Sequence, residues 1–295
     1  MDFSTVMYKE IYVTIYDLSE KLYGKLFGML NYTVTETGEK LLLPLENWNE
    51  GAFHMVRMVA EQVILPIGAI FIVFVLIARM VQIMNEGVID NAGKAVLFLK
   101  FIMFLYLWRY SFDIMNRVYA IGLEAGFKVS RLFRNLFRNE IVFDVQEQFQ
   151  MILDINPQIY DMGILIRAIL VLLCMCISYI VTLSFAVTIY YTVIVWFIEI
   201  IVQLSVAPIP ISFFALEETK DIAQQYIKKI MAMGFRPFFA IMILGLYGVF
   251  LPSVGQGESG LSAVLWTIAG SVVFNILLIR AGSFAKGVFD VSSWY

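Results

Sequence analysis

The fold class is decided by residues 163–215, GILIRAILVLLCMCISYIVTLSFAVTIYYTVIVWFIEIIVQLSVAPIPISFFA. The only charged residues in this stretch are Arg167 and Glu199. An apolar α-helix needs about 20 residues to cross the hydrocarbon core of a bilayer, and the stretch is about twice that long. It therefore predicts two membrane spans, near residues 164–186 and 190–212. No glycine or proline separates them, so one long helix that extends beyond the bilayer is the alternative.

The composition of the whole chain agrees with this interpretation. Of its 295 residues, 60% are apolar and 15% are charged, whereas soluble domains have about 45–50% and about 25%. So much apolar surface cannot be buried inside one chain of this size. The net charge of −3 also argues against binding nucleic acid through a basic face, which requires clustered Lys and Arg. The composition predicts an all-α, polytopic integral membrane protein.

Two further spans are expected before the long apolar stretch. Residues 63–83 are mostly apolar and long enough to cross the membrane. Residues 95–110 form a weaker span, because the run is short and contains Lys100, with Arg109 near its end.

Two more spans follow the long apolar stretch. Residues 230–251 form one of them, which Gly234 and Pro237 are expected to break early. Residues 261–279 form the last. The total is five or six spans.

The chain is expected to divide near residue 50. Residues 3–30 place apolar side chains at spacings of three and four among charged ones, which predicts an N-terminal amphipathic helix on the membrane surface or on a partner. Residues 31–50 follow as a polar connector, and residues 51–295 form the polytopic domain. The first residues lack a basic region followed by a short apolar run, so no removable signal peptide is expected.

The distribution of Lys and Arg indicates the orientation. Residues 252–260 contain neither, whereas the chain after the last span carries Arg280 and Lys286. Since positive residues favour the cytoplasmic side, the C-terminus is expected in the cytoplasm. The N-terminus lies on the same side with six spans and on the opposite side with five.

A basic helix is predicted near residues 127–138, with apolar side chains on its other face. This pattern suits the headgroups of an anionic membrane surface. Contact with a DNA strand is the alternative, because cations and aromatic residues alternate there. The basic face consists of Lys128, Arg131, Arg134 and Arg138.

A polar stripe crosses the central apolar stretch. Thr192, Glu199 and Gln203 fall on one side of a helix, together with Thr188. A carboxylate inside the membrane faces protein or water and not lipid. The favoured role is a structural hydrogen bond to another helix, with Arg167 or Lys100 as partner. A proton or cation relay is the alternative.

The sequence gives little support for catalysis. His54 is the only histidine, and Cys174 and Cys176 point to different sides of an apolar helix, where they are expected to be packing residues. We therefore expect no enzyme activity, no metal site and no cofactor.

A break follows the long apolar stretch. Pro208 and Pro210 disrupt the end of a helix. A new amphipathic helix over residues 216–230 then begins with acids and ends with bases, as the helix dipole favours. We expect this segment to dock a partner through Pro208, Pro210, Glu217, Glu218, Lys228 and Lys229.

Several short motifs in the chain are similar to those of one known protein family. They are Ser-x-Ala-Pro-Ile at the break, the Glu-Glu-Thr run and Lys pair after it, Trp48-Asn49 ahead of Leu-Pro-Ile-Gly, and the closing Arg-Ala-Gly-Ser-Phe-Ala-Lys-Gly. Over roughly residues 48–290 the chain resembles the polytopic inner-membrane subunit of type IV secretion systems, above all the conjugation apparatus of Gram-positive bacteria.

The resemblance implies a non-enzymatic subunit of the bacterial plasma membrane. Such a subunit helps form the path for relaxase-bound single-stranded DNA or effector protein, and it is oligomeric within a larger complex. Its implied partners are other secretion subunits, a secretion ATPase that supplies energy, and membrane lipid. The alternative is a secondary transporter or channel for a small solute, which predicts inverted repeats with matching interrupted helices. Only one clear break is found.

Overall fold

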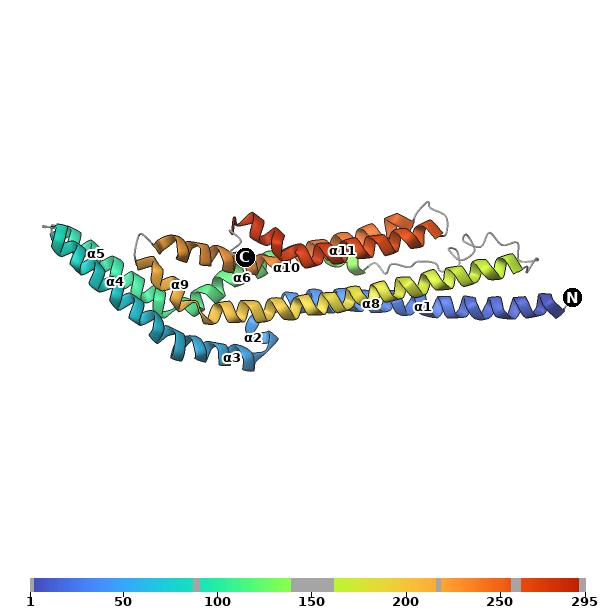
Figure 1. Cartoon of the computed structure of the whole chain (residues 1–295), viewed down its shortest axis with the longest axis horizontal. Helices are drawn as coiled ribbons and strands as arrows, with labels where there is room; N and C mark the ends of the chain where they lie inside the picture. The colour runs from blue at the N-terminus through green and yellow to red at the C-terminus, as the bar shows by residue number, and fades with distance from the viewer. Residues whose placement is uncertain (1–2, 87–90, 139–161, 216–218, 256–260, 292–295) are drawn as a thin grey trace. The chain divides into compact units, whose positions relative to one another are not determined.

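A computed structural model describes residues 3–86, 91–138, 162–215, 219–255 and 261–291 (Figure 1). Every element within these residues is helical. In chain order the elements are α1 (Phe3–Leu41), α2 (Leu45–Trp48), α3 (Glu50–Val59), the π-helical turn η1 (Ala60–Ile64), α4 (Leu65–Glu86), α5 (Asn91–Arg109), α6 (Ser111–Arg138), α8 (Met162–Ser205), α9 (Pro208–Ser212), the 3-10 turn η2 (Phe213–Ala215), α10 (Lys220–Gly255) and α11 (Leu261–Val288).

The described residues contain four helices that are long and apolar enough to cross a membrane. The all-α, polytopic membrane fold predicted from composition is therefore confirmed. The four apolar segments are Glu50–Val75, Ala168–Ser212, Lys220–Tyr247 and Ile268–Val288. The second has 45 residues, so the number of times that it crosses the bilayer remains a prediction.

Three helices differ in extent from the sequence-based expectation. Helix α1 continues to Leu41, so much of the expected connector is helical. Helix α8 is continuous through residues 187–189, where a turn between two spans was expected, because no residue there interrupts the backbone hydrogen bonds. Helix α10 is also continuous through Gly234 and Pro237, and it includes the expected docking helix from Lys220 onward.

The chain forms two compact units. The first is drawn from Met1–Glu39, Val129–Val193 and Ala240–Arg280, and the second from Lys40–Lys128, Ile194–Phe239 and Ala281–Tyr295.

In the first unit, α1 packs against α8 through a small cluster around Ile15 and Ala168. The flanking side chains on α1 are Tyr12 and Tyr16. The expected apolar stripe of α1 is only partly buried, because Ile15 is buried whereas Leu18 is exposed.

Polar contacts also join helices of the first unit. The Tyr190 hydroxyl of α8 donates to the Glu36 carboxylate of α1 at 2.9 Å. The hydroxyls of Tyr247 on α10 and Ser271 on α11 lie 2.9 Å apart. Such bonds satisfy polar groups on helices that are otherwise apolar.

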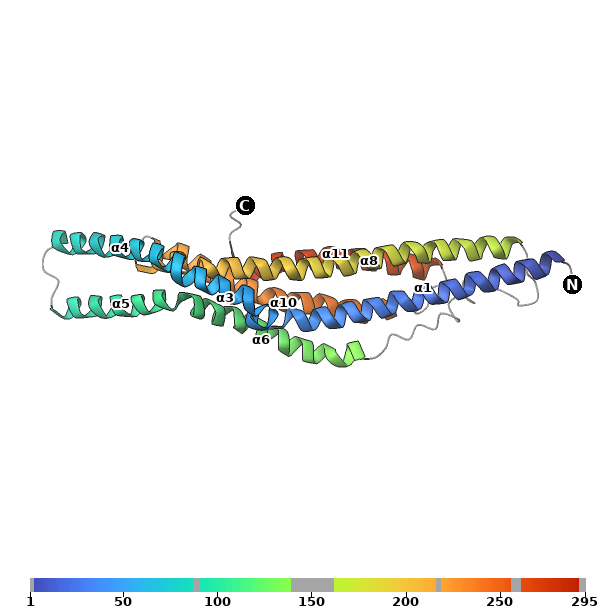
Figure 2. The same ribbon diagram turned by 90° about the horizontal axis from the view of Figure 1, so that it is seen from below.

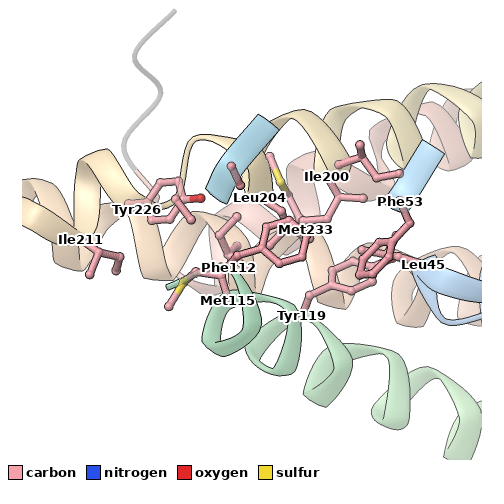
Figure 3. Packing of buried hydrophobic residues seen from close by; sticks show 14 of the residues in the cluster. Leu45, Phe53, Phe112, Met115, Tyr119, Ile200, Leu204, Ile211, Tyr226 and Met233 are labelled. Atoms are coloured by element: carbon pink, nitrogen blue, oxygen red, sulfur yellow. The ribbon is translucent and has the colours of Figure 1, made fainter. Parts of the chain in front are cut away.

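The second unit has an apolar core (Figure 3). It joins side chains from α2, α3, α6, α8, α9 and α10, among them Leu45, Phe53, Met115, Leu204 and Met233. Side chains from segments far apart in the sequence therefore meet in one cluster, which holds α8 and α10 next to each other.

Helices α4, α5 and α9 form another part of the second unit. Helices α4 and α5 run in opposite directions (Figure 2), and α9 packs against both. A Cβ atom at Gly68 of α4 would lie 2.6 Å from Nε1 of Trp108 on α5 and 3.2 Å from the carbonyl oxygen of Pro208 on α9. The absence of a side chain at Gly68 thus permits this close packing.

Candidate functional site

A charged pair joins α8 to α10 inside the second unit. The guanidinium of Arg236 binds both carboxylate oxygens of Glu199, with Nη1 donating to Oε2 and Nη2 donating to Oε1 at 3.1 Å. The Arg236 side chain is 5% exposed and the Glu199 side chain 34% exposed. Two parallel charge-assisted bonds fix both the distance and the orientation of the two helices.

The structure corrects the expected partner of Glu199. Arg167 and Lys100 were expected, but Arg236 forms the ion pair. A signal for Arg236 was present in the sequence, since it is the only charged residue within residues 230–251. Like Glu199, it is one charge in an apolar run, and two such charges of opposite sign are natural partners.

Arg236 is further enclosed by α8 and α11. Its guanidinium carbon lies 5.9 Å from the centre of the Trp196 ring of α8, within range of a cation–π interaction. A Cβ atom at Gly282 of α11 would lie 3.3 Å from Nε of Arg236. Nε has no hydrogen-bond partner among the described residues. Because Gly282 has no side chain, it leaves room for the side chain of Arg236.

Two lysines lie near the pair. The charges of Lys286 on α11 and Lys229 on α10 both act on Glu199, and both side chains are half-buried. Lys228, the neighbour of Lys229, is exposed. The two lysines of the predicted pair therefore have different environments. Lys229 lies close to the buried ion pair, whereas Lys228 is exposed on the surface.

The end of α8 is held by a hydrogen bond from α10. The Tyr226 hydroxyl donates to the main-chain carbonyl of Gln203 at 2.5 Å. This carbonyl belongs to the last turn of α8, where the helix itself supplies no donor. Tyr226 therefore satisfies a buried acceptor and connects the two helices beside the break.

The break itself lies between α8 and α9. Helix α8 ends at Ser205 and α9 begins at Pro208, the position at which proline is best tolerated in a helix. Pro208 is buried and Pro210 half-buried. Glu217 and Glu218, expected in the docking segment, lie outside the described residues.

Helices α6 and α10 approach each other closely at two glycines. A Cβ atom at Gly122 would lie 2.2 Å from the carbonyl carbon of Gly234, and one at Gly234 would lie 2.6 Å from the carbonyl oxygen of Tyr119. Burial raises the pKa of the Tyr119 phenol above its ordinary value, although the charge of Arg236 opposes this effect. Small residues thus bring the two backbones into contact beside the ion pair.

Trp48 and Asn49, from the motif ahead of the first span, have separate roles. The Trp48 ring stacks on Phe197 of α8 with a centroid distance of 4.4 Å, and its Nε1 donates to the carbonyl of Lys40 at 2.6 Å. The Asn49 side chain caps α3 by accepting from the main-chain nitrogen of Ala52 at 2.9 Å. The motif therefore anchors the start of α3 to α8.

The remaining predicted residues do not join the ion pair. Thr192 is buried in the first unit, where its hydroxyl donates to the carbonyl of Thr188 in its own helix at 2.7 Å. On the basic face, Lys128 is exposed and pairs with Glu124 at 3.5 Å. Arg131 is exposed. The side chains of Arg134 and Arg138 lie outside the described residues.

The chemistry of this site is electrostatic. Its groups can bind helices together and attract an anion, since cations outnumber the single carboxylate. Within the described residues, no group of three or more His, Cys, Asp and Glu side chains could hold a metal ion.

Comparison with known proteins gives a family match. A family model described as TrbL/VirB6 plasmid conjugal transfer like protein matches residues 30–208. The matched range includes Trp48, Glu199 and the start of the break, while Arg236 lies beyond it. Neither a curated protein nor a solved structure matches the chain.

Proposed function

The chain belongs to the TrbL/VirB6 plasmid conjugal transfer like family, and from this membership we propose that it helps form the path for cargo across the membrane. It is a membrane subunit of a type IV secretion, or conjugal transfer, system. The proposed cargo is single-stranded DNA bound to a relaxase, or an effector protein. The observation that carries the proposal is the family match over residues 30–208, which coincides with long apolar helices.

The exposed surface of α8 supports a position inside a larger membrane assembly. Large apolar side chains recur along one side of this helix at spacings of three and four. They include Ile166, Leu170, Leu173, Ile177, Ile180, Val187, Tyr191, Ile194, Ile198 and Val202, each at least 44% exposed. Lipid or the helices of neighbouring subunits would cover such a stripe. We therefore expect an oligomer whose partners are other secretion subunits.

The ion pair suits the role of a fixed internal contact. Glu199 is bound by Arg236 on a neighbouring helix, which favours the structural role of Glu199 over a proton relay. Gln203 contributes through its main-chain carbonyl, which Tyr226 binds. We propose that these contacts hold α8 against α10 while cargo passes.

The start of α10 is the proposed docking surface for a secretion ATPase or a neighbouring subunit. Lys220, Asp221, Gln224 and Lys228 are exposed on this part of the helix. Pro208 and Pro210 fix the break before it, and Glu217 and Glu218 are proposed to extend the surface. Energy for transfer would come from the ATPase, because we propose no enzyme activity for this chain.

We propose that the protein lies in the bacterial plasma membrane with a cytoplasmic C-terminus. The lysines at the start of α10 and at the end of α11 support this orientation. The basic face of α6 would then contact anionic lipid. The transporter alternative gains no support from the family match.

A transfer assay tests the docking surface. The gene is deleted, and plasmid-borne variants are compared for the frequency of conjugal transfer and for co-purification of the ATPase. We expect Lys220→Glu combined with Lys228→Glu to lower both, and Lys9→Glu, an exposed lysine of α1, to leave both unchanged. Unchanged transfer and ATPase recovery in the double variant, at normal protein level, would exclude this surface. The pair Pro208→Ala and Pro210→Ala tests the break in the same way.

A further inference from the structure

Two cations beside the buried ion pair have no acidic partner among the residues that the structure describes. Lys229 of α10 and Lys286 of α11 both act on Glu199, but the carboxylate of Glu199 is already bound by Arg236. Neither lysine forms a salt bridge with a described residue. Three cations therefore act on one carboxylate, and the charges of Lys229 and Lys286 act on each other.

The two lysines lie toward the same end of an antiparallel helix pair. Phe239 of α10 lies 6.4 Å from Phe284 of α11, and Phe235 lies 5.1 Å from Phe289, as centroid distances. Residue numbers thus decrease along α10 as they increase along α11. Lys229 is about two helical turns before Arg236, and Lys286 lies between the two contacting phenylalanines of α11.

The surroundings of Lys286 are apolar and open. Both helices belong to candidate membrane spans, and Lys286 is close to the end of its span. Phe284 and Val288, on either side of Lys286, are 43% and 67% exposed. A ligand for this place must offer a negative charge to the lysines and an apolar surface to the exposed side chains.

We propose that Lys229 and Lys286 bind the phosphate of an anionic phospholipid from the surrounding membrane, whose acyl chains cover Phe284 and Val288. A phospholipid supplies both the charge and the apolar surface, whereas a nucleic acid strand or free phosphate supplies no acyl chain. Basic pockets between membrane helices bind anionic headgroups in this way. The inference uses the contacts of α10 and α11 and does not depend on the role in conjugal transfer.

The test is lipid binding by the purified full-length protein in detergent. The probes are phosphatidylglycerol and zwitterionic phosphatidylcholine, added to delipidated protein and followed by native mass spectrometry and thermal unfolding. We expect phosphatidylglycerol to bind more tightly than phosphatidylcholine. Since a lysine near a membrane surface contributes about fivefold to anion binding, Lys229→Gln or Lys286→Gln should weaken the binding about fivefold, and the double variant about thirtyfold.

Lys228→Gln is the matched control, because Lys228 adjoins Lys229 in the same helix but is exposed. It should leave the affinity for phosphatidylglycerol within twofold of the wild-type value. Thermal unfolding without added lipid shows whether each variant is folded.

Three results would overturn the proposal. The first is equal affinity in the double variant and the wild type. The second is an equal loss in Lys228→Gln, which would indicate a general effect of charge. The third is that the double variant binds phosphatidylglycerol as the wild type does but binds a single-stranded oligonucleotide or inorganic phosphate more weakly. This result would assign the lysines to nucleic acid or to free phosphate.

Discussion

Removing Arg236 should destabilise the protein more than removing any exposed arginine. The substitution Arg236→Met keeps a long apolar side chain but leaves Glu199 without the two bonds that it accepts. Breaking a fully buried ion pair costs about 3–5 kcal/mol. Because the Glu199 side chain is 34% exposed and two lysines remain near it, we expect about half of that, roughly 2 kcal/mol.

The control is Arg57→Met. Arg57 of α3 also pairs with a carboxylate on another helix, Asp113 of α6, at 3.2 Å, but both side chains are more than 40% exposed. An exposed pair contributes about 0–1 kcal/mol. The control should therefore cost less than half as much as Arg236→Met.

The assay is unfolding in mixed micelles with increasing sodium dodecyl sulfate, followed by circular dichroism. A double variant, Glu199→Gln with Arg236→Met, removes both charges and should recover about 1 kcal/mol relative to the sum of the single variants. If Arg236→Met costs no more than Arg57→Met, or if the double variant shows no coupling, the ion pair does not hold α8 against α10.

Two other contacts give predictions in the same assay. Gly122→Ala should destabilise the protein by about 2 kcal/mol or more, because its Cβ would lie 2.2 Å from the backbone of Gly234. The control is Gly24→Ala, whose Cβ meets no atom within 4 Å and which should stabilise the protein slightly because alanine favours helix. Equal effects of the two variants would contradict the close contact. Tyr226→Phe should cost about 1 kcal/mol by leaving the Gln203 carbonyl without its donor, and a neutral result would show that the hydroxyl does not secure the end of α8.

The apolar runs predicted the fold class because burial in lipid demands them. Length alone could not determine where one span ends and the next begins. Residues 187–189 contain nothing that stops a helix, and α8 continues through them. Pro237 was expected to break α10, but one missing amide donor within a long packed helix did not interrupt it.

The candidate site was predicted only in part. Glu199 was recognised because one carboxylate in an apolar run needs a partner. The partner was misassigned because pairing depends on which helices are neighbours, and the sequence does not contain that information directly. Arg236 was overlooked between Gly234 and Pro237, since this segment was interpreted as a break. The same glycine, at the close contact with Gly122, helps bring α10 beside α6.

This chain is a membrane subunit of a conjugal transfer system. Membership in the assembled complex is tested by gentle solubilisation of the tagged protein from native membranes, mild cross-linking, and identification of the co-purifying proteins by mass spectrometry. We expect recovery with a secretion ATPase and other conjugation subunits. Recovery alone, as a monomer or small homo-oligomer, under conditions that keep the rest of the complex intact, would contradict it.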